Sequence, residues 1–111
     1  MSRDWPRRGE IWLVGVPDDT KRRSCVVLST DWLNQHSLDV TVVPISSVAR
    51  GKFPTRVPLN AGEGGQHTDS WAKCDQVTTV NKSRLVGGCF GQLSEAQLQA
   101  IADAVRSALD L

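Results

Sequence analysis

The chain consists of short apolar runs separated by turn residues, and only its last segment has helical periodicity. This order of elements restricts the possible folds more than any other feature. The runs are rich in β-branched and aromatic residues and are bounded by Gly, Pro, Asp and Ser, which is typical of β-strands. Strands are predicted over residues 9–16, 24–29, 38–46, 53–60, 70–77 and 84–93. Many short strands followed by one helix predict a mainly β protein (α+β), with a small, curved antiparallel sheet or partly open barrel.

The terminal helix is predicted over residues 94–109. Ser94 followed by Gln97 matches the capping-box pattern, and Glu95 lies where a negative charge complements the helix dipole. Apolar residues then recur at helical spacing, namely Leu98, Ile101, Ala102, Val105, Ala108 and Leu109. This stripe is expected to pack against the rest of the domain.

The segments that follow the first strand differ in their expected exposure. Residues 24–29 are apolar enough to be buried on both faces. Residues 30–37, with Thr30 or Asp31 as the N-cap, allow no more than one or two helical turns. Residues 61–70 contain three glycines and no apolar anchor, which predicts a mobile loop.

Proline and glycine set the expected limits of the remaining strands. The strand over 38–46 is expected to end near Pro44, because proline cannot donate to a ladder. The two prolines in residues 53–60 predict an edge strand. Residues 84–93 are rich in glycine, so we expect bulges or sharp bends there.

Residues 70–77 alternate in polarity, which predicts that Lys73 and Asp75 share one face of a strand. Gln76 then belongs to the opposite face. An acid and a cation two positions apart have two possible roles. They are either placed together at one phosphate or form a surface ion pair worth roughly 0–1 kcal/mol.

Length and charge describe a single domain, residues 1–111, of ordinary globular composition. No apolar run approaches the roughly 18 residues of a membrane span, and the N-terminus lacks the apolar region of a secretory signal. A cytoplasmic protein without membrane contact is expected. The net charge is only +1, whereas nucleic-acid-coating domains have a pI above about 9. Any nucleic acid is therefore expected at a local site.

The cysteines and histidines predict no metal site. The three cysteines, Cys25, Cys74 and Cys89, form no C-x-x-C pattern, and the two histidines, His36 and His67, have no zinc-ligand spacing. We expect three reduced thiols and no cofactor.

Five runs, in order, resemble MazF/PemK-type toxins of toxin–antitoxin systems. They are "RGEIWLV" (8–14), "RSCVVLS" (23–29), "VVPIS" (42–46), "CDQV-TTV-KSRL" (74–85) and "GQLSEAQL" (91–98). The resemblance extends over roughly residues 7 to 109. It implies an SH3-like barrel of the kind shared by MazF and CcdB toxins, and usually a homodimer.

The same resemblance implies the activity. Toxins of this family cleave single-stranded RNA, typically mRNA at a short sequence motif, without a metal ion, and so inhibit translation and growth. RNA supplies its own 2′-hydroxyl nucleophile, so such a protein contributes positioning and electrostatic stabilisation. The resemblance further implies a cognate antitoxin with a partly disordered segment that covers the RNA-binding surface.

Arg23 matches the catalytic arginine of the family, which directly precedes the second strand. A guanidinium suits phosphate because it is planar, permanently charged and able to hold two oxygens. The family usually has a proline after this arginine, where this chain has Ser24, so the backbone beside Arg23 is less restricted. Lys21 and Arg22 are interpreted as phosphate-steering or solvated cations.

Ser46 occupies the position of the family's threonine in "P-I-T", here "PIS", and keeps the hydroxyl. It is the second expected catalytic residue. The alternative is a strand-end serine that bonds nearby backbone groups. Ser47 follows it and is a candidate contact to the substrate.

Asp75 is the third expected catalytic residue, because PemK-like members carry a basic residue and an aspartate in this run. Lys73 and Gln76 are expected to contact the RNA. His67, in the predicted loop, is a weaker candidate for substrate binding near neutral pH.

Two other functions fit the same expected fold, because fold alone does not determine function. One is a non-enzymatic toxin that binds a protein target such as DNA gyrase, as CcdB does. The other is a catalytically degenerate member that only binds its antitoxin. Arg23 and the hydroxyl of Ser46 favour the nuclease, since a gyrase poison needs neither.

Overall fold

The computed structural model describes residues 5–15, 22–48, 54–60 and 69–111. Its strands are β1 (Glu10–Gly15), β2 (Arg22–Val27), β3 (Asp39–Ser46), β4 (Arg56–Leu59), β5 (Ser70–Lys73), β6 (Thr78–Asn81) and β7 (Leu85–Gln92). Its helices are α1 (Asp31–His36) and α2 (Glu95–Leu109), with short 3₁₀ turns η2 (Cys74–Gln76) and η3 (Lys82–Arg84). Among these described helices, none has the length and apolar character needed to cross a membrane.

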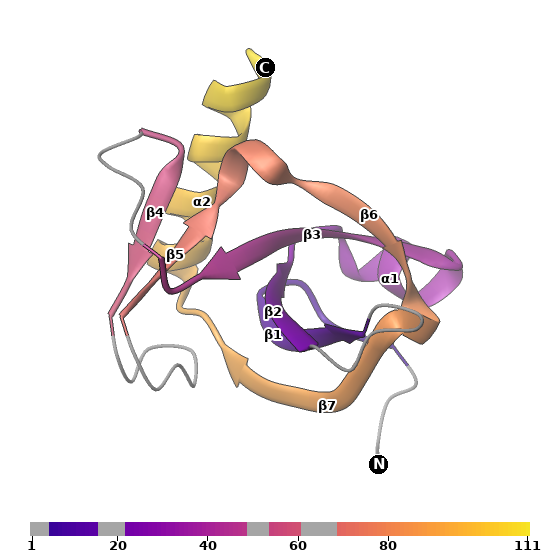
Figure 1. Ribbon diagram of the computed structural model, residues 1–111. Coiled ribbons are helices and arrows are strands. Elements are labelled where there is room, and N and C mark those ends of the chain that lie inside the picture. Colours follow the sequence, from indigo (N-terminus) through magenta and orange to yellow (C-terminus); the bar gives the residue numbers. More distant parts are fainter. Residues whose placement is uncertain (1–4, 16–21, 49–53, 61–68) are drawn as a thin grey trace.

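All strand pairs are antiparallel, and the order along the sheet is β4-β5-β3-β2-β1-β7. Strand β3 belongs to two parts of the sheet. One edge of β3 pairs with β2, while the other edge pairs first with β6 and then with β5. Figure 1 shows how β1, β2, β3, β6 and β7 curve around a common interior, with β4, β5 and α2 to one side. The predicted mainly β fold with a partly open barrel is confirmed.

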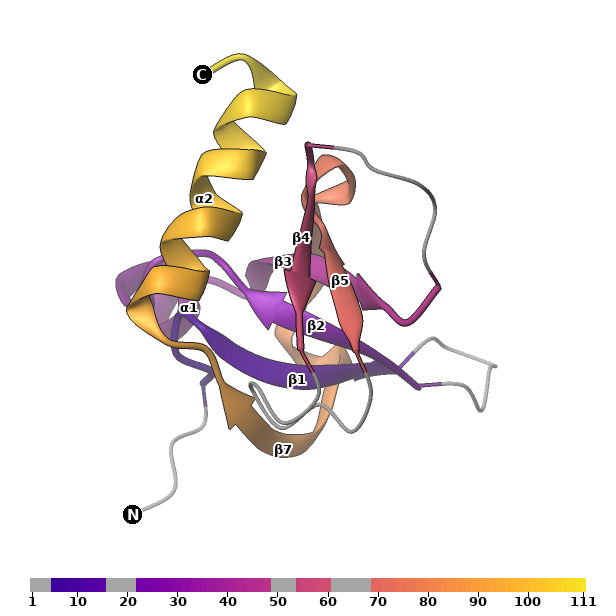
Figure 2. The ribbon, with the colours of Figure 1, turned by 90° about the vertical axis from the view of Figure 1, so that its left-hand side faces the viewer.

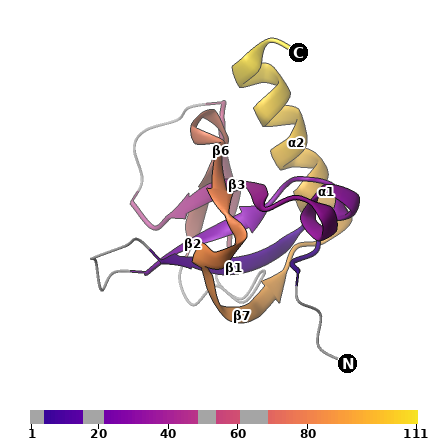
Figure 3. The same cartoon turned by 90° about the vertical axis from the view of Figure 1, so that its right-hand side faces the viewer.

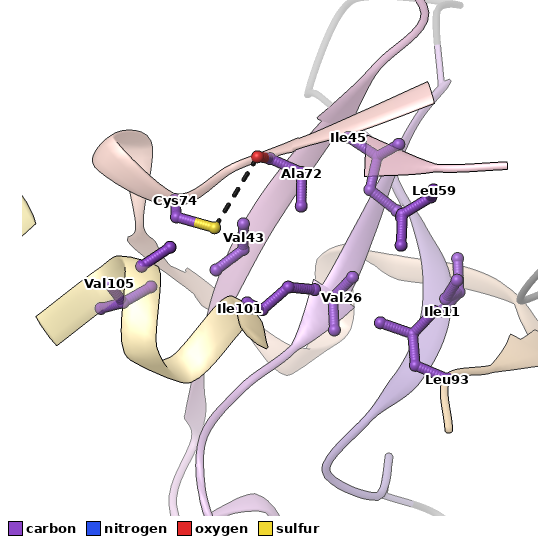
Figure 4. Packing of buried hydrophobic residues seen from close by; sticks show 11 residues of the cluster. Ile11, Val26, Val43, Ile45, Leu59, Ala72, Cys74, Leu93, Ile101 and Val105 are labelled. Carbon is purple, nitrogen blue, oxygen red and sulfur yellow. Dashed lines mark hydrogen bonds between the residues drawn. The ribbon is translucent and has the colours of Figure 1, made fainter. Parts of the chain in front are cut away.

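Strand β2 separates two apolar cores. Its Val26 side chain packs under α2, with Val43 of β3 and Ile101 of α2 (Figure 4). Its Cys25 and Val27 point to the other face, into the barrel interior. The prediction that residues 24–29 are buried on both faces is confirmed for Cys25, Val26 and Val27.

Helix α2 begins as predicted. The Ser94 hydroxyl accepts a hydrogen bond from Gln97 N, and the Gln97 side chain accepts one from Ser94 N. The helix lies against β4 and η2 (Figure 2). The apolar stripe was only partly right, because Ala104 is buried and Leu109 is 50% exposed. The buried face is therefore centred on Ile101, Ala104 and Val105.

The short helix and the edge strand were also predicted correctly. Thr30 is the N-cap of α1, and its hydroxyl accepts a hydrogen bond from Leu33 N. Strand β4 ends the sheet order, as its prolines indicated, and Pro58 is exposed. Strand β7 contains the expected irregularity, since its register with β1 shifts between Ile11 and Leu13.

The third strand ends as predicted, two residues after Pro44. Strand β3 reaches Ser46, and Pro44 itself lies inside the strand and pairs with Cys25 of β2. On the other edge of β3, residues Asp39 to Val42 pair with β6, and Ile45 and Ser46 pair with β5. Pro44 lies in the gap between them, so no ladder hydrogen bond on that edge requires its missing N–H.

The strand predicted over 70–77 was too long. Strand β5 ends at Lys73, and Cys74–Gln76 form the turn η2. The expected common strand face for Lys73 and Asp75 is therefore wrong. Tertiary contacts hold the turn, because Cys74 N donates to Thr55 O and the Cys74 side chain is buried beneath α2. Residues 78–81, for which no strand was predicted, pair with β3 as β6.

Three sequence predictions fall wholly or mostly outside the described residues. The predicted mobile loop lies mostly in residues 61–68, and His67 lies within that range. Lys21 lies in another such range, residues 16–21.

Replacing Ile101 with alanine is expected to lower the free energy of unfolding by about 2–5 kcal/mol. Ile101 is fully buried between α2 and the sheet, so its removal leaves a cavity in the core. Urea denaturation measures the change. Ser107→Ala, on the exposed face of the same helix, is the control and should change stability by less than about 0.5 kcal/mol. A comparable loss for both variants would contradict the packing of α2.

One of the three thiols is expected to react in the folded protein. Burial raises the pKa of Cys25 to about 12 and that of Cys74 to about 11, so both stay protonated at pH 8. Partial burial raises the pKa of Cys89 as well, but its side chain is exposed. Because reactivity depends on access as well as on the thiolate, Ellman's reagent should modify Cys89 in the folded protein and the other two only after unfolding in urea. Cys89→Ser should leave no rapidly reacting thiol.

Candidate functional site

A surface cavity of 380 Å³ lies where β2 begins and β3 ends. We call it the phosphate cavity. Three strands and the turn after β3 line it, with Arg22, Arg23 and Ser24 from β2, Ile45 and Ser46 from β3, Ser47 and Val48 after β3, and Ser70 from β5. It brings together residues that are far apart in the sequence.

The pairing of β2 with β3 accounts for this arrangement. Cys25 lies opposite Pro44, and Val26 lies opposite Val43. Extending the same register by two residues places Arg23 opposite Ser46. On the other edge of β3, Ser46 pairs with Trp71, which brings Ser70 to the same place. The position of the cavity thus follows from the strand register.

The phosphate cavity has the composition of an anion site. Arg22 and Arg23 are exposed, and both line it. The described residues of its lining also supply four serine hydroxyls and include no carboxylate. Guanidinium groups can hold two oxygens of a phosphate in a bidentate manner, and hydroxyls add single hydrogen bonds. The arrangement can therefore bind a phosphate and stabilise additional negative charge on it.

Ser46 has a defined local role as well. Its Oγ accepts a hydrogen bond from Val48 N at 3.1 Å, which stabilises the turn after β3. This matches the alternative of a strand-end serine. A hydroxyl that accepts one bond still has a hydrogen to donate, so the contact also orients Oγ for donation to an anion.

Asp75 lies in a different environment. Its carboxylate is 38% exposed, and its Oδ1 lies 3.2 Å from Arg56 Nε. Arg56 Nη2 donates to Oδ2 at 3.3 Å, and Thr55 Oγ1 donates to Oδ1 at 3.1 Å. These contacts tie η2 to β4. Asp75, with its neighbours Lys73 and Gln76, does not belong to the lining of the phosphate cavity.

The structure thus groups four of the nine predicted site residues, namely Arg22, Arg23, Ser46 and Ser47. Lys73, Asp75 and Gln76 are not among the residues that line this cavity, while Lys21 and His67 lie outside the described residues. Sequence reasoning missed Ser70 and treated Ser24 only as a departure from the family pattern. The sequence feature that could have identified Ser70 is its position at the start of a predicted strand, next to a glycine-rich segment.

Within the described residues, no group of three or more His, Cys, Asp or Glu side chains is arranged to hold a metal ion.

Comparison with known proteins agrees with the fold and with the sequence pattern. The family model described as "PemK-like, MazF-like toxin of type II toxin-antitoxin system" matches residues 7–109. Endoribonuclease MazF9 of Mycobacterium tuberculosis is 31% identical over 115 residues, which cover 95% of this chain and 97% of the relative. Endoribonuclease MazF3 of the same species is 34% identical, covering 82% of this chain and 85% of the relative.

Solved structures extend the comparison to three dimensions. The Mycobacterium tuberculosis toxin MazF-mt6 has a TM-score of 0.79 and 30% identity, covering 92% of this chain and 97% of that one. A mycobacterial endoribonuclease, solved in complex with its cognate antitoxin, has a TM-score of 0.80 and 24% identity, covering 96% of both chains. The second similarity concerns the fold alone.

The match to the family model and the identity to the two mycobacterial endoribonucleases each extend over most of the chain. The chain belongs to the PemK-like, MazF-like family of toxins of type II toxin–antitoxin systems.

Proposed function

We propose that this protein is the toxin of a type II toxin–antitoxin system and acts as a metal-independent endoribonuclease on single-stranded RNA. The observation that carries the proposal is the convergence of Arg22, Arg23 and Ser46 on one cavity whose described lining has no carboxylate. Its relatives MazF9 and MazF3 are named endoribonucleases. Cleavage at a short motif in mRNA would inhibit translation and growth.

The cavity suits attack by the RNA's own 2′-hydroxyl on the adjacent phosphorus. The 2′-oxygen forms a bond to phosphorus as it loses its proton, and the bond from phosphorus to the 5′-oxygen breaks as that oxygen gains a proton. The products are a 2′,3′-cyclic phosphate and a 5′-hydroxyl. Arg23 stabilises the negative charge that accumulates on the phosphate oxygens, and Ser46 donates a hydrogen bond to one of them.

The other charged residues take supporting roles in this proposal. Arg22, with Lys21 beside it in sequence, attracts the RNA backbone, and Ser47 adds a hydroxyl contact. Lys73, Gln76 and His67 contact RNA that flanks the cut. Asp75 is the candidate acid or base, and its pairing with Arg56 would orient the carboxylate.

The proposal includes the usual partners of such a toxin. The single domain of residues 1–111 forms a homodimer in the cytoplasm, and a cognate antitoxin with a partly disordered segment neutralises it. The structure of an endoribonuclease of the same fold in complex with its cognate antitoxin supports the antitoxin as a partner. A CcdB-like gyrase poison is not favoured, because it would need neither Arg23 nor a hydroxyl at Ser46.

Arg23→Ala is expected to slow RNA cleavage about 10²- to 10³-fold, as removal of an electrostatic donor typically does. Ser46→Ala should slow cleavage by about tenfold or more, because a hydrogen bond to a charged group is lost. The assay follows cuts in a long single-stranded RNA in EDTA, and product ends are tested for the cyclic phosphate.

The control for this assay is Arg106→Ala, which removes an exposed guanidinium from α2. It should cleave RNA at the parental rate. Ser47→Ala shows whether the neighbouring hydroxyl substitutes for Ser46. If folded Arg23→Ala cleaved RNA at the parental rate, the catalytic role of Arg23 would be disproved. If the parent protein left the RNA uncut, the gyrase-binding toxin or the catalytically degenerate member would be favoured.

Asp75→Asn is expected to slow cleavage by roughly 10²- to 10⁴-fold if its carboxylate transfers a proton, and to remove one limb of the pH–rate profile. Arg56→Gln is the matched variant, because it breaks the same ion pair and leaves the carboxylate in place. It should retain more activity than Asp75→Asn, because the carboxylate is still present although it has lost the partner that orients it. Equal losses in both variants would mean that only the ion pair between β4 and η2 matters.

A further inference from the structure

A second, smaller cavity adjoins the phosphate cavity and shares Arg23 and Ser24 with it. We propose that this base cavity binds one pyrimidine base of the RNA, beside the phosphate that Arg23 holds. The inference rests on the proposed function and deepens it by naming the class of nucleotide that the site selects. The base cavity is lined by Val14, Arg23, Ser24, Cys25, Val42, Pro44, Thr78, Val80 and Arg84.

The walls of the base cavity belong to the barrel interior. Val14 of β1, Cys25 of β2, Val42 of β3 and Val80 of β6 are all buried and pack in one cluster. Figure 3 views the molecule from the side of β6, the strand that completes this wall. The exposed residues Arg23 and Thr78 mark the opening. The cavity is therefore an apolar recess with a polar rim, which is the usual form of a ligand site.

The volume of the base cavity matches one six-membered ring. The cavity measures 170 Å³. An apolar protein cavity of about 150 Å³ holds one benzene molecule, and one water takes up about 30 Å³ of liquid volume. A pyrimidine is a single six-membered ring and fits such a volume. A purine has a second fused ring, so it would have to leave part of its surface outside.

The rim supplies donors for the oxygen atoms of a pyrimidine. Arg84 Nε donates to Gly15 O at 3.0 Å, which fixes its guanidinium at the end of β1. A guanidinium has five N–H donors, so this bond uses one of them. Uracil and cytosine both carry the O2 carbonyl, and the lining residues Arg84, Thr78 and Ser24 carry the N–H and O–H donors that suit it at the edge of an otherwise apolar recess.

Continuity with the phosphate cavity favours a nucleotide as the occupant. One ribose joins a base to its phosphate, and Arg23 and Ser24 form the boundary between the two cavities. Bases of single-stranded RNA are free to leave the stack and enter protein pockets, which is how such RNA is usually recognised. A site for phosphate beside a site for one ring thus matches a single nucleotide of the substrate.

The first test measures binding without cleavage. The methyl NMR signals of Val14, Val42 and Val80 are followed while uridine or cytidine 3′-monophosphate is added, with adenosine and guanosine 3′-monophosphate for comparison. The pyrimidine nucleotides are expected to shift these signals, and the purine nucleotides are not. Thr78→Phe should abolish the shifts, because an aromatic ring at the rim fills the opening.

The matched control is Thr79→Phe. Thr79 is also exposed on β6, but it lies on the opposite face of the strand and does not line the base cavity. This variant should bind pyrimidine nucleotides like the parent. Thermal unfolding of both variants shows that each is folded, so loss of binding in Thr78→Phe alone is attributable to the filled cavity.

The second test measures cleavage. Once the cut sites of the parent are mapped, replacing the pyrimidine next to the cut by a purine should slow cleavage by about tenfold or more, in line with the loss of one bound base. Thr78→Phe should slow cleavage of the pyrimidine RNA similarly, and Thr79→Phe should not.

The two tests separate the two proposals. If pyrimidine nucleotides shift the methyl signals but the protein does not cleave RNA, the nuclease proposal is disproved and the pyrimidine site is retained. Cleavage without methyl shifts, or with equal shifts from purine nucleotides, would reject the pyrimidine site and keep the nuclease. In that case the apolar recess would suit a side chain of a bound peptide.

Discussion

Burial of β2 on both faces is the constraint on which the rest of the structure depends. Its residues Cys25 and Val27 pack inside the barrel while Val26 packs under α2, and β1 and β3 pair with its two edges. A shift of one residue in register would exchange these faces, and full burial of a valine contributes about 1.5–3 kcal/mol. The same register determines where Arg23 emerges, so the core of the domain positions the guanidinium at the phosphate cavity.

Local signals predicted the elements whose structure is decided locally. The capping box of Ser94 and Gln97 and the prolines of the edge strand are examples. The end of the strand predicted over residues 70–77 was wrong because alternation of polarity contains no information on contacts with residues distant in the sequence. The bond from Cys74 N to Thr55 O and the pairing of Asp75 with Arg56 turn the chain into η2. Strand β6 was missed for a related reason, since it is identified by its pairing with β3 rather than by its composition.

The candidate site was predictable only in part. The resemblance to a family identified Arg23 and Ser46 as candidate site residues. Their separation of 23 positions in the sequence does not indicate that they lie close together in the fold. Their meeting depends on strand pairing, as does the arrival of Ser70 from β5. Arg56 could not be foreseen as the partner of Asp75, because β4 and η2 approach only in the folded chain. Sequence identified candidate chemistry, and the fold decided which candidates share a cavity.

Strand β7, at the end of the sheet order, has a bend with its own consequence. Gly87 and Gly88 both have left-handed backbone conformations, with φ of 76° and 77°. An outer strand that is straight can pair with a strand of another molecule and begin an aggregate. Two consecutive left-handed residues prevent such continuous pairing along β7, even though Phe90 nearby is 40% exposed. The bend at these two glycines therefore also removes one route by which sheet edges of neighbouring molecules could pair.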